Sequence, residues 1–304
     1  MIKLFINRPY LPEGMNKSYQ ENANMLLTLN DAKKYITEST PLEFTVDRCD
    51  HLHHLHGTIG HFPVQINREN AISPYISGAD KEISILSLVG KPICGTLTAV
   101  TQAQDGTPLL HLSRKQLQEN ALSYLLDTLH EGDIIPAVIA SISSIGVFAD
   151  IGCGIIALLP IRQISVSRIS HPNERFLPNQ TIFCVIEKID HLERRFLLSH
   201  KELLGTWTEN AAQFQEGETV TGIVRGIKSY GVFIELAPNL TGLAEPDERL
   251  QEGDRVSVLI KSILPEKHKI KLHVVGLLPS SSYKSALHYA LTKGNINNWS
   301  YFDS

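Results

Sequence analysis

Short apolar runs dominate the chain between residues 42 and 275. The runs are four to eight residues long, rich in Ile, Val and Phe, and separated by Gly, Pro, Asn and Asp. This pattern is typical of β-strands joined by tight turns. About five strands fit each unit of roughly 65–75 residues. The sequence therefore predicts small barrels, because closure removes the exposed edges of short strands.

Helical spacing replaces the β pattern in the connecting segments. Residues 113–129 carry four apolar side chains on one helical face, and residues 199–214 carry a weaker pattern that Gly205 interrupts. The four side chains are those of Leu117, Ala121, Leu122 and Leu125. Another helix is predicted at Tyr283–Leu291, and a short one is expected in the N-terminal arm, residues 1–36.

An internal repeat organises the chain. Glu131–Ile151 and Glu216–Leu236 align at an offset of 85 with seven identities in 21 positions, including the block Gly-Val-Phe in both copies. A second match, Cys184–Asp190 with Val258–Leu264, lies at an offset of 74, so the connecting loop is 11 residues shorter in the second copy. A loop of variable length between matching strands is typical of a repeated domain.

A third, degenerate copy is predicted upstream, from about Leu42 to Lys115. The segments LLHLSRK and FLLSHKE end two copies in the same way, at an offset of 86. The first half of the upstream copy lacks the Gly-Val-Phe block and instead carries the histidine-rich stretch HLHHLH.

Composition narrows the class of protein. Of 304 residues, 20% are charged and 42% hydrophobic, which excludes global disorder. The chain contains no apolar run of the ~18–20 residues that a membrane helix needs. Four cysteines lie at least 31 residues apart and form no C-x-x-C pair, which favours reduced thiols in a cytoplasm. A net charge of −4 argues against bulk electrostatic binding of nucleic acid.

The repeated motifs resemble a known family. The pattern G-V-F-[VI]-[DE], followed by a strand ending in G-L and by V-x-x-I-D-x-x-x-x-R-x-x-L-S, is similar to the RNA-binding domain named after bacterial ribosomal protein S-one. The order of the whole chain, with the motif Leu11–Gly14 (L-P-E-G) before three repeats and an aromatic tail, resembles a short class of these proteins in Clostridia-like bacteria. The resemblance implies a mainly β fold of tandem five-stranded OB-type barrels joined by short α-helices.

The chain is therefore divided into seven predicted segments. They are an N-terminal arm (1–36), a degenerate S-one domain (37–115), a helical linker (116–130), an S-one domain (131–200), a second helical linker (201–215), an S-one domain (216–275), and a C-terminal helix with an aromatic tail (276–304).

The resemblance also implies which residues contact RNA. The family presents two aromatics three residues apart around a glycine, which match Tyr230 and Phe233 in the last copy but Ile145 and Phe148 in the middle copy. The family's aspartate on the fourth strand matches Asp190 in the middle copy. The last copy has Leu264 at this position instead. The family's basic residue near the end of the domain matches Arg195 and Lys269. The position that often holds His is Pro160 or Glu245 here, so that contact is missing.

The predicted RNA-binding residues are divided between two copies. They are Tyr230, Phe233, Lys228, Lys269 and Lys271 in the last copy, and Phe148, Arg195, Asp190 and Arg168 in the middle copy.

Aromatic faces suit single-stranded RNA because stacking tolerates most sequences and contributes about 1–3 kcal/mol per base. Strand alternation alone would put Tyr230 and Phe233 on opposite faces, so a bend or bulge at Gly231 is expected to turn both outward. The alternative is that Phe148 and Phe233 fill the barrel cores.

Local charge weakens the objection from the net charge. Arg255–His273 carries five basic residues against one acidic residue, and Arg162–Lys201 carries seven against four. Such local excesses can line a groove. The alternative is that Lys267, Lys269 and Lys271, which alternate with other residues, only form the solvent-exposed face of a strand.

Other chemistry has little support in the sequence. The histidines between His51 and His61 have no recognised metal-ligand spacing and are expected on a surface hairpin. No nucleophile elbow, zinc-protease, Walker or Rossmann motif occurs in the sequence. Cys153 lies between two glycines and is therefore predicted to be a turn residue. We therefore expect a non-enzymatic protein without a cofactor or metal.

The sequence thus favours a cytoplasmic RNA-binding protein whose partners are single-stranded RNA or mRNA and the small ribosomal subunit, acting in translation initiation, with no membrane partner. Two alternatives stay open: a ribosome-docking module that has lost RNA affinity, or an accessory subunit for RNA degradation. The aromatic tail (Trp299, Tyr301, Phe302) is expected to dock onto the last barrel, or else to anchor a partner. The oligomeric state does not follow from the sequence.

Overall fold

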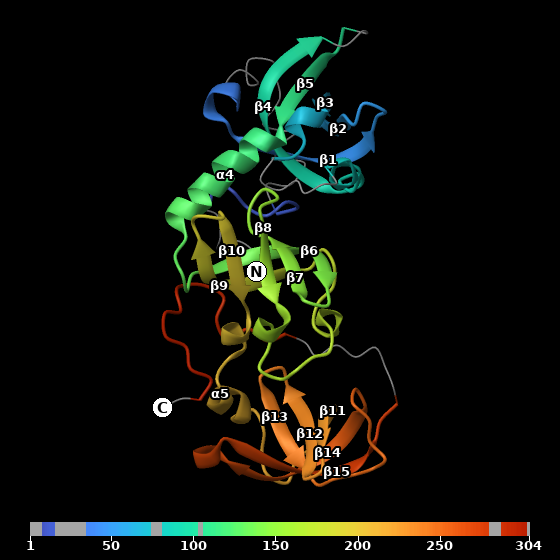
Figure 1. Cartoon of the computed structure of the whole chain (residues 1–304), viewed down its shortest axis with the longest axis vertical. Coiled ribbons are helices and arrows are strands. Elements are labelled where there is room, and N and C mark those ends of the chain that lie inside the picture. Colours follow the sequence, from blue (N-terminus) through green and yellow to red (C-terminus); the bar gives the residue numbers. More distant parts are fainter. Residues whose placement is uncertain (1–7, 16–34, 74–80, 103–105, 280–286, 303–304) are drawn as a thin grey trace.

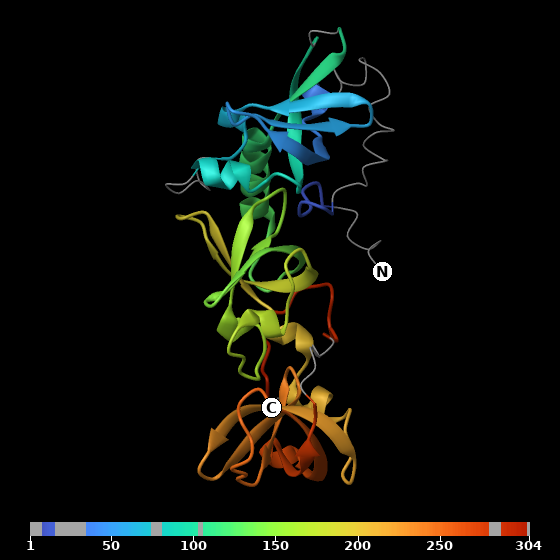
Figure 2. The same cartoon turned by 90° about the vertical axis from the view of Figure 1, so that its right-hand side faces the viewer.

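The computed structural model describes residues 8–15, 35–73, 81–102, 106–279 and 287–302. Three closed five-stranded barrels follow one another along the long axis of the molecule (Figures 1 and 2). We call them the first, middle and last barrel in chain order. The predicted mainly β fold of tandem barrels is confirmed, and the degenerate first copy is also a closed barrel.

The three barrels share one topology. Around each barrel the strands follow the order first, second, third, fifth, fourth, with a parallel pair between the third and fifth strands. The first barrel contains β1 (Pro41–Cys49), β2 (Leu55–Ile59), β3 (Phe62–Ile66), β4 (Pro92–Gln102) and β5 (Pro108–Ser113). The middle barrel contains β6 (Ile134–Ser143), β7 (Gly146–Asp150), β8 (Ile156–Pro160), β9 (Thr181–Asp190) and β10 (Arg195–Ser199). The last barrel contains β11 (Thr219–Lys228), β12 (Gly231–Ala237), β13 (Leu240–Ala244), β14 (Arg255–Leu264) and β15 (Lys269–Leu277).

Alternation of side chains builds a separate core inside each barrel. In β12, for example, Val232 and Ile234 point inward and are fully buried, whereas Phe233 between them is half-buried on the outside. A bulge interrupts the first strand of every barrel, between Val46 and Arg48 and at the matching places in β6 and β11. Such bulges bend a strand, which helps a short sheet close.

Helices connect the barrels, as predicted, but the second connector is shorter than expected. Helix α4 (Arg114–Thr128) begins at Ser113, whose side chain accepts a hydrogen bond from Gln116 N. The second connector splits into a 3₁₀ turn, η4 (Lys201–Leu204), and α5 (Trp207–Ala211). Gly205 between them has φ +83°, which ends the first turn. Other short helices in the described part of the chain are η1 (Arg68–Asn70), α3 (Lys81–Leu86), η2 (Ile161–Gln163), η3 (Pro172–Glu174) and η5 (Pro265–Lys267), and residues 35–38 are also helical.

The C-terminal segment is an extended strap and not a helix. The helix predicted at Tyr283–Leu291 is wrong in its described part, because residues 287–302 contain no helix. Gly294 O and Gly132 O accept hydrogen bonds from Ile134 N and Ile296 N, which holds the strap on the middle barrel. These contacts with distant strands override the local helical spacing.

The aromatic tail docks onto the last barrel and its connector. Tyr301 O accepts a hydrogen bond from Trp207 N at 2.9 Å, and the Tyr301 hydroxyl donates to Asn239 O at 2.6 Å. The Phe302 ring lies 4.6 Å from that of His268. Self-docking of the tail, one of the two interpretations of the sequence, is therefore what the structure shows.

The Leu11–Gly14 motif joins the first barrel to the middle barrel. Arg114, almost fully buried, donates two hydrogen bonds to the Glu13 carboxylate at 2.8 and 2.9 Å. Glu13 also accepts from Cys94 N in β4, and its own N–H donates to Asp150 in β7 at 2.7 Å. A short helix was predicted in the arm without bounds, and most of the arm (residues 1–7 and 16–34) lies outside the described residues.

The longer loop of the middle barrel joins it to the last barrel. This loop, residues 161–180, carries the 11 residues that the last copy lacks. Ser167 N donates to Pro238 O, and Val166 N donates to the Asn239 side chain, both at 3.0 Å. Arg175, at the end of η3, reaches Glu235 in β12 at 2.6 Å. The loop-length difference found in the sequence therefore marks a contact between barrels.

Candidate nucleic-acid interface

The strand register defines one outward strip that crosses the five strands of each barrel. In the last barrel the paired positions are Gly226, Phe233, Leu243, Lys271 and Ser262. In the middle barrel they are Ser141, Phe148, Leu158, Leu197 and Lys188. None of these residues is buried. We call these two sets the last strip and the middle strip.

The predicted aromatic pair lies at the last strip, with Phe233 on the strip and Tyr230 in the turn before β12. Tyr230 and Phe233 lie with ring centroids 6.1 Å apart at an interplanar angle of 87°. Tyr230 is 65% exposed, and Phe233 is half-buried and lies outside the core of its barrel. Phe148 likewise lies outside the middle core. The alternative that both phenylalanines fill the cores is therefore wrong.

Gly231 has a different role from the one expected. The bulge lies in β11, between Val224 and Gly226, and not at Gly231. Tyr230 faces outward because it belongs to the two-residue turn before β12, where strand alternation does not apply. A Cβ atom at Gly231 would lie 2.6 Å from Ala244 O. Glycine is therefore needed there because the neighbouring strand approaches too closely for a side chain.

The predicted lysines of the last barrel lie on the same outer face as the aromatic pair. Lys271 is next to Leu243, which is next to Phe233, so the cation and the ring are separated by one strand. Lys228 pairs with Gly231 at the end of β11. Lys269 lies two positions before Lys271 on the same exposed face of β15. Leu243, 36% exposed between the ring and Lys271, was missed because no sequence motif marks it.

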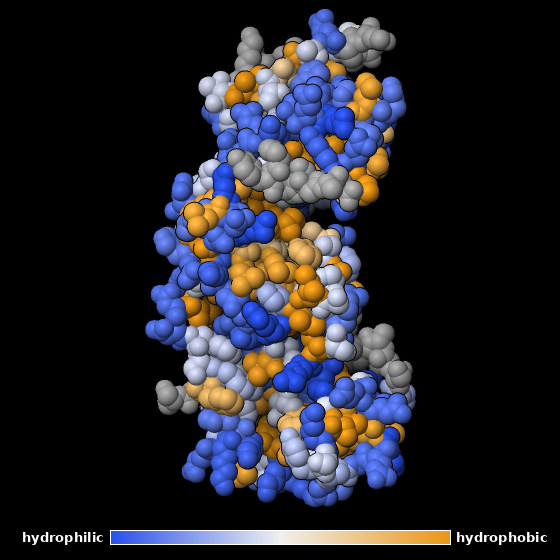
Figure 3. All heavy atoms as spheres, in the orientation of Figure 1, coloured by the Kyte–Doolittle hydropathy of each residue, from blue (hydrophilic) through white to orange (hydrophobic). Residues whose placement is uncertain are grey.

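The middle strip is apolar at its centre. Phe148 lies between Ser141 and Leu158, and Leu197 follows on β10. Figure 3 shows a patch of apolar side chains over the middle barrel, around β7 and β8, on the face turned toward the viewer. Ile145, which replaces the second aromatic, is 60% exposed in the turn before β7. The middle strip therefore offers one ring and several aliphatic side chains.

Two of the three polar residues predicted for the middle barrel lie side by side, and the third lies elsewhere. Arg195 is exposed on β10, two positions before Leu197, and pairs across the hairpin with Asp190. Asp190 accepts hydrogen bonds from Leu192 N and Glu193 N at 3.1 and 3.0 Å, which closes the hairpin turn. Arg168 is exposed in the long loop beside the last barrel and does not belong to the strip. Asp190 lies two positions after Lys188 on β9, so Arg195 and Asp190 both border the middle strip, and Arg168 does not.

Lys188 was missed by the sequence comparison. It is exposed on β9 and pairs with Leu197, which makes it the basic end of the middle strip. Alignment of the two copies could have identified Lys188, because it matches Ser262, which lies on the last strip.

The acidic residue that ends the G-V-F motif is turned away from the strip in both copies. Asp150 and Glu235 occupy equivalent positions and are nearly fully buried at the two barrel junctions. Asp150 accepts from the N–H groups of Gly152 and Gly154 at 2.8 and 3.0 Å. Burial, together with the nearby Glu13 carboxylate, raises the pKa of Asp150 well above its ordinary value. These carboxylates hold the barrels together and are not available to a ligand.

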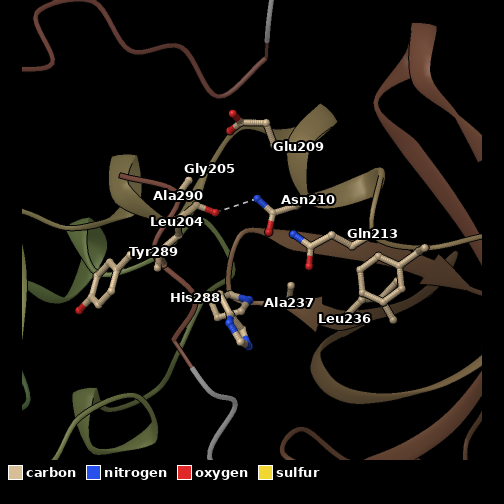
Figure 4. A pocket seen from close by; sticks show the side chains of 12 residues that line it. Leu204, Gly205, Glu209, Asn210, Gln213, Leu236, Ala237, His288, Tyr289 and Ala290 are labelled. Atoms are coloured by element: carbon tan, nitrogen blue, oxygen red, sulfur yellow. Dashed lines mark hydrogen bonds between the residues drawn. The ribbon is translucent and has the colours of Figure 1, made fainter. Parts of the chain in front are cut away.

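A hollow of about 310 Å³ lies at the junction of the middle and last barrels. Figure 4 shows the side chains of Gln213 and His288 beside it, with Asn210 donating to Leu204 O at 2.8 Å. The hollow is lined by the connector, the end of β12 and the C-terminal strap. It contains none of the residues of the two strips.

The described residues also bear on the expectations for metal, membrane and cysteine chemistry. Among the residues that the structure describes, no group of three or more His, Cys, Asp or Glu side chains is arranged to hold a metal ion. The helices in the described part of the chain are all too short or too polar to cross a membrane. Cys153 lies buried in the turn between β7 and β8 with φ +48°, as predicted for a turn residue.

Comparisons with known proteins agree with this architecture. Residues 128–201 match the family described as "S1 RNA binding domain". The small ribosomal subunit protein bS1 of Staphylococcus aureus is 31% identical over 185 residues, which cover 56% of this chain and 47% of that protein. The bS1 protein of Staphylococcus epidermidis is 30% identical over 187 residues with the same coverage. The chain thus spans about half the length of these curated relatives.

One solved structure to which the chain is similar is that of a multidomain protein with nucleic acid binding domains from Streptococcus pneumoniae. It is 13% identical, covers 80% of this chain and 74% of its own, and has a TM-score of 0.26. The family match coincides with the middle barrel, whose strands run from Ile134 to Ser199. Residues 128–201, the middle barrel, therefore match an S1 RNA-binding domain, and 56% of the chain is similar to bS1 proteins.

Proposed function

We propose that the chain binds single-stranded RNA, with the last strip as its main site. The observation that carries this proposal is the Tyr230–Phe233 pair beside Lys228 and Lys271 on the outside of a barrel. Unstacked bases of a single strand can lie against such rings, and lysines beside them can contact the phosphates. Nothing in this arrangement reads a base edge through fixed donors and acceptors, so binding tolerates most sequences.

Magnitudes set the expected affinity range. Each stacked base contributes about 1–3 kcal/mol, so losing both rings would weaken binding by roughly 25-fold or more. The net charge of −4 limits non-specific attraction to a polyanion. Binding is therefore expected to be reversible, dependent on stacking and sensitive to salt.

Fluorescence anisotropy with a labelled single strand tests the proposal. The Tyr230→Ala, Phe233→Ala double variant should lose most of the affinity, whereas Tyr230→Phe, which keeps a ring, should retain it. Phe302→Ala is the matched control, because this aromatic is 51% exposed in the same region but lies off the strip. Unchanged affinity in the double variant, or a binding curve that does not respond to salt, contradicts the proposal.

The finer role that we propose is contact with mRNA on the small ribosomal subunit during translation initiation, in the cytoplasm. Its support is the match to relatives named as small ribosomal subunit protein bS1. Co-sedimentation of the purified protein with small subunits tests this role. Association that competing single-stranded RNA reduces supports it, and an absence of association overturns it without affecting the RNA-binding proposal.

A second function, docking onto a protein of the ribosome, is favoured by one observation on the middle barrel. Phe148, Leu158 and Leu197 form an apolar centre with exposed Ile145 nearby. The Phe148→Ala, Leu158→Ser variant separates the two functions. Reduced co-sedimentation with unchanged RNA affinity would assign the middle strip to protein contact, and the reverse would assign it to RNA.

A further inference from the structure

The first barrel has a strip at the same register as the other two. Its paired positions are Arg48, His56, Gln65, His111 and Ala99, and none of these residues is buried. His56 therefore occupies the position of Phe148 and Phe233. His111 occupies the position of Lys271. We call this set the first strip.

The three-residue spacing of the rings is also kept. His53 precedes His56 as Tyr230 precedes Phe233, and Asp50 N bonds His54 O in the turn just as Lys228 pairs with Gly231. His53 is 26% exposed and has φ +59°, so the left-handed turn places it outside the strand. The stretch HLHHLH, which lacks the Gly-Val-Phe block, thus supplies rings where the last barrel has Tyr and Phe.

Hydrogen bonds orient the His56 ring. Its Nε2 donates to Asp50 Oδ2 at 2.8 Å, and Asp50 also accepts from Leu52 N and His54 N at 2.9 Å each. Burial opposes ionisation of Asp50, but these hydrogen bonds hold its pKa well below the ordinary value. A hydrogen bond to a ring nitrogen lies in the plane of the ring, so it leaves the faces of the imidazole for stacking.

Polar groups flank the ring along the strip. Gln65 Nε2 contacts His54 Nδ1 at 3.2 Å and Asn67 Oδ1 at 3.0 Å. His111 Nε2 lies 2.8 Å from the Thr101 hydroxyl. Arg48, one strand from His56, is exposed. The surface therefore combines ring faces, hydrogen-bonding groups and one permanent cation beside the Asp50 carboxylate.

We propose that the first strip is a third binding site for single-stranded RNA, in which a base stacks on His56 and polar groups of the strip contact the same strand. This proposal rests on the proposed function. Histidine is one of the side chains on which unstacked RNA bases stack. Because the one arginine of the strip and the Asp50 carboxylate bonded to His56 carry opposite formal charges, the strip binds through bases more than through phosphates. It is therefore the weaker site and is filled by strands that already occupy the last barrel.

Photo-crosslinking of the full chain tests the proposal without any substitution. RNA containing 4-thiouridine is irradiated with the protein, and the linked peptides are identified by mass spectrometry. The expected result is crosslinks to the turn around His53–His56 in addition to crosslinks near Tyr230. Crosslinks in the last barrel with none in the first overturn this inference alone. An absence of crosslinks throughout overturns the proposed function and this inference with it.

Strand length gives a second test. A strand of about 30 nucleotides can reach all three barrels at roughly 4–16 nucleotides each, whereas one of about six nucleotides occupies a single barrel. The His53→Ala, His56→Ala variant should lose about fivefold or more in affinity for the long strand and nothing for the short one. His56→Phe keeps a ring and should restore binding.

His61→Ala is the matched control, because His61 is an exposed histidine of the β2–β3 turn outside the strip. Equal losses for the control and the strip variant overturn the proposal. So does a strip variant that binds the long strand normally but no longer co-sediments with small ribosomal subunits, since that result assigns the first strip to a protein partner.

Discussion

Neutralising Glu235 perturbs the contact between the middle and last barrels most directly. Its carboxylate accepts from Arg175 Nη2 and Arg225 Nε, both at 2.6 Å. The side chains of Glu235 and Arg175 are 2% and 1% exposed, and that of Arg225 is 8% exposed. Arg225 also pairs with Glu174 of the long loop. Glu235→Gln therefore removes the shared negative charge between two buried guanidinium groups.

The size of the effect follows from burial. Removing one partner of a buried ion pair costs about 3–5 kcal/mol, because the remaining charge stays desolvated without compensation. Glutamine still accepts one hydrogen bond, and Glu174 still neutralises Arg225, so the lower end of that range, about 3 kcal/mol, is expected. Since a whole domain has roughly 5–15 kcal/mol of stability, the loss is large.

Urea unfolding followed by tryptophan fluorescence measures this loss. Trp207 is 2% exposed and packs against the core of the last barrel, so its emission reports on this end of the molecule. Glu245→Gln is the matched control, because Glu245 pairs with Lys261 at 3.0 Å on the open surface of the same barrel. Exposed pairs contribute little to stability, so the control is expected to unfold like the wild type.

Equal urea midpoints for the two glutamine variants would contradict a large contribution from the buried ion pairs. Replacing the cluster by apolar side chains provides a further check, because such replacements of buried ion pairs are often neutral. The Arg175→Met, Glu235→Leu double variant should therefore be more stable than Glu235→Gln. A double variant that is less stable than the single one contradicts the assignment of the loss to an uncompensated charge.

Two further perturbations address the barrel junctions. Burial lowers the pKa of His200 from 6.5 to about 4. The stability that neutral His200 provides above pH 6.5 is therefore lost as the pH falls toward 4. Unfolding curves across this range should show that His200→Gln removes roughly 3 kcal/mol of this loss. Glu13→Ala leaves the buried Arg114 unpaired and should lower the melting temperature by several degrees; a melting temperature equal to that of the wild type would show that the Leu11–Gly14 motif does not join the barrels.

The strands and helices followed largely from local patterns. The offsets of 85 and 74 predicted two barrels and a loop of different length, and the helix over 113–129 is present as α4. The helix predicted at Tyr283–Leu291 failed because Tyr289 and Ala290, in its described part, bond to residues 87 to 106 positions away. Local spacing carries no information about such partners.

The candidate site was predicted in part. Tyr230, Phe233, Lys228 and Lys271 do lie together, because each is fixed by its neighbours along a strand and by short-range register. Arg168 does not join the middle strip, since it lies on the loop toward the last barrel, whereas Asp190 pairs with Arg195 beside the strip and closes the hairpin turn. The matching strip of the first barrel was invisible in the sequence, because histidines replace the Gly-Val-Phe block there.

The sequence by itself determined the repeat, the β character of each unit and the positions that alternate between inside and outside. Only the tertiary structure decided what the outward positions contact. Phe148 and Phe233 stay on open faces, whereas Asp150 and Glu235, two positions further along the same strands, are buried against neighbouring barrels. The physical reason is that alternation is a property of one strand, but burial at a junction depends on residues about 60 to 140 positions away.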